Sequence, residues 1–182
     1  MGTWGCRTDR VLGQSLILNV RIGGAYHHAE TWPEMSSVID LVLREQHVSI
    51  PGVGIGDPVS FSFAEYRRTA ETRGLWPDNY LRIGVNSTTG YGGLVWYVSP
   101  KRAEASGEEK DQYCWVSDNP NPPNFDPQVL SDPGSPLCYD RRSTMPISCV
   151  REALEEFCRM ATGDRPEFIS WVRGEINGER ID

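Results

Sequence analysis

The chain has 182 residues, the size of one ordinary domain, and 38% of them are hydrophobic, which is enough to form a buried core. It carries 25 acidic against 18 basic residues, a net charge of −7, and this acidic balance argues against nucleic-acid binding. No apolar run approaches the roughly 20 residues of a membrane helix, and residues 1–10 lack a signal-peptide core, so we expect a cytoplasmic protein with no membrane partner.

The N-terminal part of the chain predicts one strand and one helix. Residues 14–22 are rich in aliphatic side chains and are followed by two glycines, as strands often are. Thr31 and Glu34 have the spacing of a capping box, which starts a helix. Apolar residues at positions 35, 38, 39 and 42 then give this helix one buried stripe, extending to about His47.

The middle of the chain predicts an antiparallel meander. A short strand at 59–63 precedes three clearer strands at 79–86, 93–99 and 111–117. Residues 64–78 fit no regular element, and residues 100–110 are a charged link. Residues 118–136 contain six prolines, a density that predicts a long loop.

The C-terminal part predicts a second helix and a closing strand. The helix starts near Pro146 and stops at Gly163, and the strand spans 167–172. The apolar stripe of this helix is Ile147, Val150, Leu154, Phe157, Cys158 and Ala161. The predicted fold is α+β, with a mostly antiparallel sheet of about five to six strands and two helices packed on one face. We expect one domain over 1–182, in which residues 1–75 supply the first strand and helix.

Alternation along the meander predicts which side chains face the helices. The core face would carry Leu81, Ile83, Val85, Leu94, Trp96, Val98, Cys114 and Val116. The opposite face would carry Tyr80, Arg82, Tyr97, Tyr113 and Trp115. Aromatic side chains on this second face need cover, either from a partner or from the 118–146 segment folding back over them.

Local motifs for catalysis are incomplete. His28-Ala29-Glu30 matches the first half of the zinc deaminase signature, but no Pro-Cys-x-x-Cys segment supplies the second half. The side chains of His27 and His28 diverge, and the five cysteines are scattered. We therefore expect no metal, no cofactor and no enzymatic activity. A Cys–His or carboxylate site assembled from distant residues stays open, because such sites leave no local motif.

Several segments, taken in order, resemble a known family. They are the 80–86 and 90–97 strand pair, the 113–117 strand, and the helix from Pro146 that runs into Thr162-Gly-Asp-Arg-Pro166, with Trp171 in the closing strand. Over residues 79–173 the chain resembles the first family in the numbered Imm series, the immunity proteins of bacterial polymorphic toxin systems usually encoded beside deaminase toxins. The resemblance implies a cognate toxin, a nucleic-acid cytosine deaminase, that is held inactive in a tight complex. It implies no catalytic residues.

The charge distribution suggests where such a toxin binds. Residues 103–140 hold eight carboxylates against one lysine, a pattern that either suits a basic partner or only keeps the protein soluble. We predict an interface over 104–140, because carboxylates there can pair with the basic groove of a nucleic-acid enzyme. The predicted charges are Asp111, Asp118, Asp126, Asp132 and Asp140, and the predicted anchors are Tyr113, Trp115, Phe125 and Tyr139. The predicted function is toxin neutralisation by occlusion, with a small enzyme or a non-catalytic adaptor as alternatives.

Overall fold

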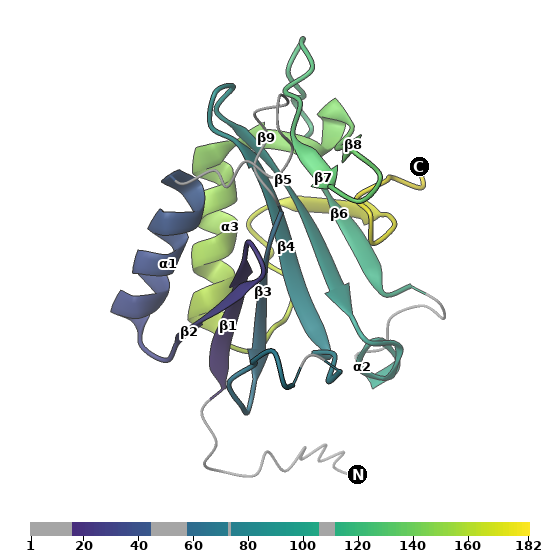
Figure 1. The fold of residues 1–182 in the computed structure, drawn as a ribbon. Coiled ribbons are helices and arrows are strands. Elements are labelled where there is room, and N and C mark those ends of the chain that lie inside the picture. The colour runs from purple at the N-terminus through teal and green to yellow at the C-terminus, as the bar shows by residue number, and fades with distance from the viewer. Residues whose placement is uncertain (1–15, 45–57, 73, 106–111) are drawn as a thin grey trace, which may run out of the picture.

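A large antiparallel sheet dominates the fold (Figure 1). The computed structural model describes residues 16–44, 58–72, 74–105 and 112–182. The helices are α1 (Trp32–Arg44), α2 (Pro100–Ala105) and α3 (Ile147–Met160), with a 3-10 turn, η1, at Arg141–Ser143. The strands are β1 (Ile17–Ile22), β2 (Ala25–Ala29), β3 (Val59–Ala64), β4 (Asn79–Asn86), β5 (Tyr91–Val98), β6 (Cys114–Asp118), β7 (Leu130–Asp132), β8 (Leu137–Cys138), β9 (Thr144–Pro146) and β10 (Ser170–Arg173).

The main sheet has eight strands in the order β10-β6-β5-β4-β3-β1-β2, and β9 pairs with the first residues of β5. All described pairings are antiparallel. The sheet is therefore larger than the expected five to six strands, because β2 and β9 were not predicted. Outside it, β7 and β8 form a small hairpin at the end of the proline-rich segment, and α2 occupies part of the expected link.

The ends of the two long helices follow local chemistry. The Glu34 carboxylate accepts the backbone N–H groups of Glu30 and Thr31 at 2.9 and 3.0 Å, the reciprocal half of a capping box. These bonds favour the ionised form and lower the pKa of Glu34. Helix α3 ends at Met160, and its C-cap residue Ala161 has a left-handed φ of 50°, two residues before the predicted stop at Gly163. The predicted end of α1 near His47 lies outside the described residues.

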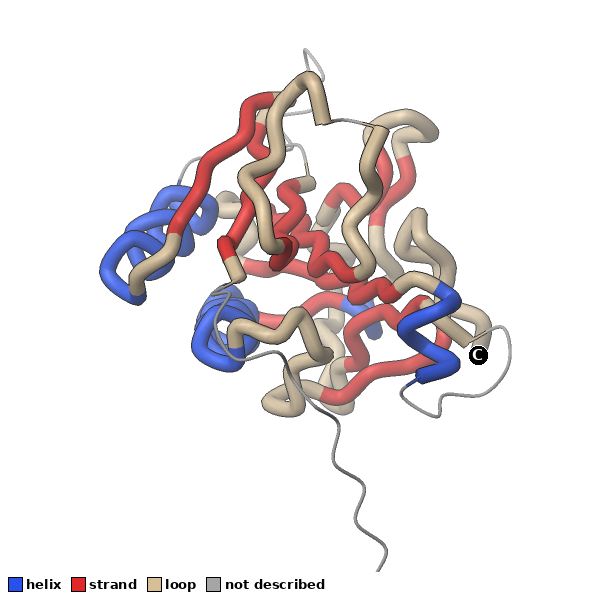
Figure 2. The backbone as a smooth tube through the Cα atoms, turned by 90° about the horizontal axis from the view of Figure 1, so that it is seen from below, coloured by secondary structure: helices blue, strands red, loops and turns tan. Residues whose placement is uncertain are grey.

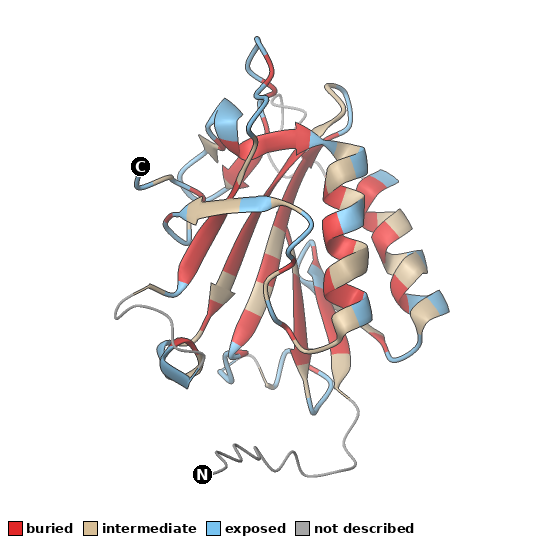
Figure 3. Ribbon diagram, turned by 180° about the vertical axis from the view of Figure 1, so that it is seen from behind, coloured by how far each residue is buried: buried red, intermediate tan, exposed pale blue. Residues whose placement is uncertain are grey.

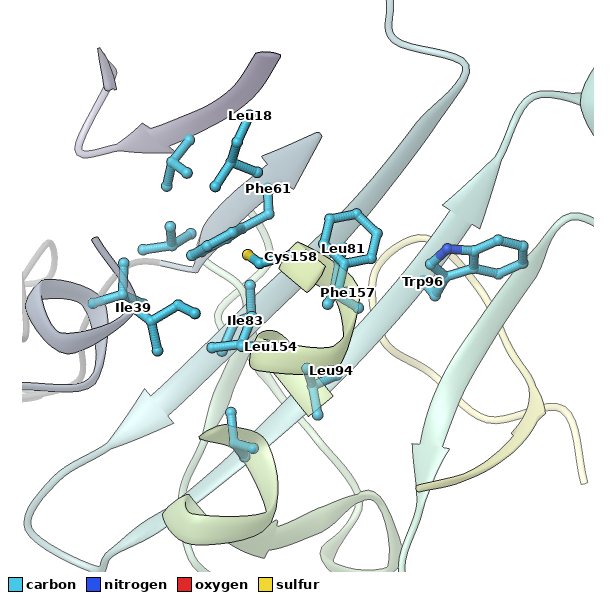
Figure 4. Packing of buried hydrophobic residues seen from close by; sticks show 14 of the residues in the cluster. Leu18, Ile39, Phe61, Leu81, Ile83, Leu94, Trp96, Leu154, Phe157 and Cys158 are labelled. Atoms are coloured by element: carbon cyan, nitrogen blue, oxygen red, sulfur yellow. The ribbon is translucent and has the colours of Figure 1, made fainter. Parts of the chain in front are cut away.

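Helices α1 and α3 lie next to one another against one face of the sheet (Figures 2 and 3). The Arg151 guanidinium of α3 joins the Asp40 carboxylate of α1 at 2.7 Å. Apolar side chains of both helices form one buried cluster with alternate residues of β1, β3, β4 and β5 (Figure 4). In that cluster the rings of Phe157 and Phe63 lie 5.4 Å apart.

The opposite face of the sheet is covered over one half by the chain itself. Tyr139 and Val129, from the 118–146 segment, bury Val95, Cys114 and Val116. Burial raises the pKa of the Cys114 thiol to about 12. The segment thus folds back over the sheet, which was one of the two forms of cover expected from the sequence.

Three of the predicted side-chain orientations on β6 are wrong. Trp115 pairs with Trp96 across the strands, with ring centres 5.1 Å apart, and both belong to the helix-side cluster. Cys114 and Val116 consequently face the proline-rich segment. All three of these β6 residues are buried, so hydrophobicity alone did not distinguish the two faces.

Glycines on β4 and β5 allow this close cover. Gly84 and Gly93 are cross-strand partners, and Tyr139 packs directly above them. A Cβ atom on Gly84 would lie 2.3 Å from the carbonyl oxygen of Leu130, and one on Gly93 would lie 2.8 Å from the ring of Tyr139. Both distances are too short, so a side chain at either position would displace the covering segment.

We predict that Gly84→Ala lowers the free energy of unfolding by about 1–3 kcal/mol, the usual cost of overpacking. Urea denaturation measures the change. Gly74→Ala is the matched control, because a Cβ atom there meets nothing within 4 Å. A Gly84→Ala protein as stable as the control would show that β7 does not lie on β4 in this way.

Candidate partner-binding surface

The other half of the second face is not covered by the proline-rich segment. One cross-strand row runs through Tyr26 of β2, Arg21 of β1, Ser60 of β3 and Arg82 of β4. The small serine between two arginines leaves space above the sheet, and Ser62 does the same in the next row. The result is a hollow of about 390 Å³. We call it the arginine hollow, lined by Arg21, Arg68, Arg82, Tyr26, Trp76 and Tyr80.

The segment before β4 forms one wall of the arginine hollow and is held by Asn19. The Asn19 side chain is 1% exposed; its oxygen accepts the backbone N–H of Arg68 at 2.7 Å, and its nitrogen donates to the carbonyl of Tyr66 at 3.2 Å. The ring of His28 donates from Nε2 to the carbonyl of Arg68 at 2.8 Å. A buried amide thus ties this irregular segment to the sheet.

The Arg68 side chain is held as firmly as its backbone. Its guanidinium lies 5.3 Å from the ring centre of Tyr26, and its Nη2 donates to the carbonyl of Leu75 at 3.0 Å. These contacts place Trp76 at the rim, where it is 81% exposed. Neither Arg68 nor Trp76 was predicted as a site residue from the sequence. The signal that could have found them is the presence of aromatic residues in a segment without hydrophobic periodicity.

The arginines of the hollow lack acidic partners. Among the described residues, no carboxylate lies within ion-pair distance of Arg21, Arg68 or Arg82. Burial raises the pKa of the nearby Tyr80 and Tyr97 hydroxyls, so both stay neutral at physiological pH. The hollow is therefore a cationic site on an acidic protein.

Aromatic side chains extend this surface across the sheet. Tyr80 stacks on Tyr97 at 4.8 Å, and Tyr97 meets the edge of Tyr113 at 6.0 Å. Tyr113 is 39% exposed. Ile176 of the C-terminal tail is 48% exposed and lines both the arginine hollow and a second hollow beside Tyr97 and Tyr113. Large exposed apolar groups of this kind mark binding surfaces.

Five residues of the predicted interface are accessible. Phe125 is 45% exposed and leans edge-on against Tyr91 at 5.5 Å. Asp126 and Asp132 each accept the backbone N–H two residues later, at 2.9 Å. Asp140 accepts the backbone N–H of Arg142 at 2.8 Å and so caps η1. Together with Tyr113, these side chains remain candidates for contact with a partner.

The other predicted residues do not fit the interface as expected. Trp115 and Tyr139 are 4% and 3% exposed, so they are core residues of the isolated chain and not anchors. Asp118 pairs at 2.9 Å with Arg180, whose side chain is 6% exposed, and this bond fastens the C-terminal tail to β6. Asp111 lies outside the described residues.

Within the described residues, no three His, Cys, Asp or Glu side chains gather closely enough to hold a metal ion. His27 and His28 lie in β2, and the ring of His28 is engaged with the carbonyl of Arg68. In the same part of the chain, no helix is long and apolar enough to cross a bilayer.

A sheet that is covered by helices on one face, and on the other presents exposed aromatics and arginines with no carboxylate partner among the described residues, is typical of a protein-binding domain. The family model described as Immunity protein Imm1 matches residues 23–173, and the chain belongs to this family of immunity proteins. The match also includes α1, β2 and β3, which lie before the segments that carried the resemblance. Neither the curated proteins nor the solved structures gave a match.

Proposed function

We propose that this protein binds a cognate toxin in a stoichiometric complex and neutralises it by occluding its active site or substrate groove. The observation that carries the proposal is the family match over residues 23–173. The finer proposal, that the toxin is a nucleic-acid cytosine deaminase, rests on the resemblance alone. We place the protein in the cytoplasm, where the four described cysteines would stay unpaired.

The exposed carboxylates beside the sheet support a basic partner. An enzyme acting on nucleic acid presents a cationic groove to the phosphates, and carboxylates compete for the same arginines and lysines. In our proposal Asp126, Asp132 and Asp140 supply this charge, while Phe125 and Tyr113 supply apolar contact. In our proposal no residue has a catalytic role, and the protein acts by binding.

Co-expression tests the function. The toxic domain encoded by the neighbouring gene should lose its toxicity when this protein is present, and the two should co-purify in a fixed ratio. Toxicity that is unaffected by the protein would refute the proposal. Cytosine deamination by the isolated domain, abolished on adding one equivalent of the protein, would support the finer proposal.

Neutralising the acidic side should mainly slow association. Asp126→Asn with Asp132→Asn keeps both backbone-capping oxygens but removes two charges, so the fold should be unchanged. We expect an association rate about threefold or more lower at low salt, a weaker salt dependence and a similar dissociation rate. Stopped-flow mixing with the toxin domain measures both rates. Glu152→Gln, at an exposed position on α3, is the control. If this variant associates as slowly as the double variant, Asp126 and Asp132 do not belong to the interface.

A further inference from the structure

We infer that the arginine hollow receives a carboxylate side chain of the toxin, and that an apolar residue beside that carboxylate packs on Trp76. The inference rests on the proposed function and names a second contact, outside the 104–140 segment. The interface would then contain both acidic groups, on the loop side, and basic groups, the arginines on the sheet.

The first support is a buried hydrogen-bond donor of Arg68 that lacks an acceptor. Arg68 is 9% exposed, and its Nε–H, buried in the wall of the hollow, has no hydrogen-bond partner among the described residues. Buried donors are almost always paired, and an unpaired one costs stability until an acceptor arrives. The donor belongs to a guanidinium already fixed by Tyr26 and Leu75, so little ordering is needed on binding.

The second support is the match between the arginines and a carboxylate. Arg21 projects from the sheet with its side chain exposed, two strands away from Arg82 in the same row. The Nη2 of Arg82 already donates to the carbonyl of Ile176, so among the described residues Arg21 is the arginine of this row that is free to bind a carboxylate. A guanidinium presents its N–H groups in a planar fork that fits the two oxygens of a carboxylate. Within the described chain the ion pairs are made by other arginines, including Arg67, Arg102, Arg151 and Arg180, and no carboxylate there pairs with an arginine of the hollow.

The rim argues for a polypeptide as the source of the carboxylate. Leu75, Trp76 and Ile176 are 56%, 81% and 48% exposed, and they extend apolar surface beyond the hollow. A small anion would use the arginines and leave this surface in water. A protein segment covers both, because the residues next to its acidic side chain reach the rim.

The acidic and basic parts of the interface adjoin. Asp132 and Pro133 share a neighbouring hollow with Arg21 and Arg82. A toxin whose basic group meets Asp132 would therefore place an acidic neighbour over Arg21. Such an arrangement fixes the orientation of the partner and rejects surfaces of a single charge.

Charge reversal at Arg21 tests the inference. No hydrogen bond or ion pair of this side chain within the described residues stabilises the fold, so Arg21→Glu should unfold at the wild-type temperature. We expect its Kd for the toxin domain of the neighbouring gene to rise by about 30-fold or more, as for a charged hot spot. Arg44→Glu, the same charge change at the end of α1, should alter Kd by less than about threefold.

The toxin side of the test identifies the group. Replacing exposed Asp or Glu residues of the toxin by Arg, one at a time, should yield one variant that binds Arg21→Glu better than it binds the wild type. If no such toxin variant is found, the inference that a toxin carboxylate occupies the hollow is refuted. If inorganic phosphate raises the melting temperature of the wild type but not of Arg21→Glu, and competes with the toxin, the hollow is a small-anion site instead.

Two further results separate this inference from the proposed function. If the wild type binds and neutralises the toxin but Arg21→Glu does so equally well, the function stands and the contact at the hollow is refuted. If the wild type does not bind the toxin domain, the proposed function fails and the inference fails with it.

Discussion

Replacing Phe157 by alanine is expected to lower the free energy of unfolding by about 3–5 kcal/mol. The Phe157 side chain is fully buried, its ring contacts that of Phe63, and it lies in the cluster that joins both long helices to the sheet. Truncation would leave a cavity that the surrounding strands cannot close without breaking their register. Leu154→Ala, one turn earlier and also fully buried, should cost about 2–5 kcal/mol.

Urea denaturation of the purified variants measures these losses. Glu152→Ala, at an exposed position on the same helix, is the control and should change the unfolding free energy by less than about 0.5 kcal/mol. A Phe157→Ala protein as stable as this control would mean that α3 does not pack on the sheet through this stripe. Deletion of everything after Ser143 should leave an insoluble chain, because it removes α3 and the edge strand β10.

Replacing Trp76 by alanine is expected to weaken the complex with the toxin by about 2–4 kcal/mol, at least 30-fold in Kd, without lowering stability. Trp76 is 81% exposed in the isolated chain, so its removal costs the fold little. A tryptophan at the rim of a charged hollow contributes a large rigid contact area and shields the ion pair from water.

Phe168→Ala provides the matched control for Trp76. Phe168 is also an exposed aromatic, at 55%, but it lies beside α3 on the helix-covered side. Calorimetric titration with the toxin domain should give the wild-type Kd for this variant. Equal losses for both variants, or none for Trp76→Ala, would mean that the toxin does not use the open half of the second face.

Elements with strong local signals were predictable from the sequence. The β4 boundaries match those expected, because its apolar residues alternate without interruption from Leu81 to Val85. The start of α1 followed from Thr31 and Glu34, whose hydrogen bond the structure contains. Strand β2 was missed because Tyr26, His27 and His28 give an edge strand no apolar alternation.

The candidate site was less predictable because distant residues build it. Asn19 holds the backbone of Arg68 across 49 positions of sequence, and this contact sets where Trp76 lies. The burial of Tyr139 depends on Gly84 and Gly93 meeting across two strands. A composition rich in prolines indicates a loop, but it does not predict which glycines that loop will pack against.

A structure of the complex between this protein and the toxin domain would test the proposed binding mode most directly. We expect the toxin to lie over the open half of the second face, with an acidic side chain at Arg21 and Arg82 and with basic groups beside Asp126 and Asp132. A toxin seated on the outer surfaces of α1 and α3, with the arginine hollow left in solvent, would refute the binding mode proposed for this immunity protein.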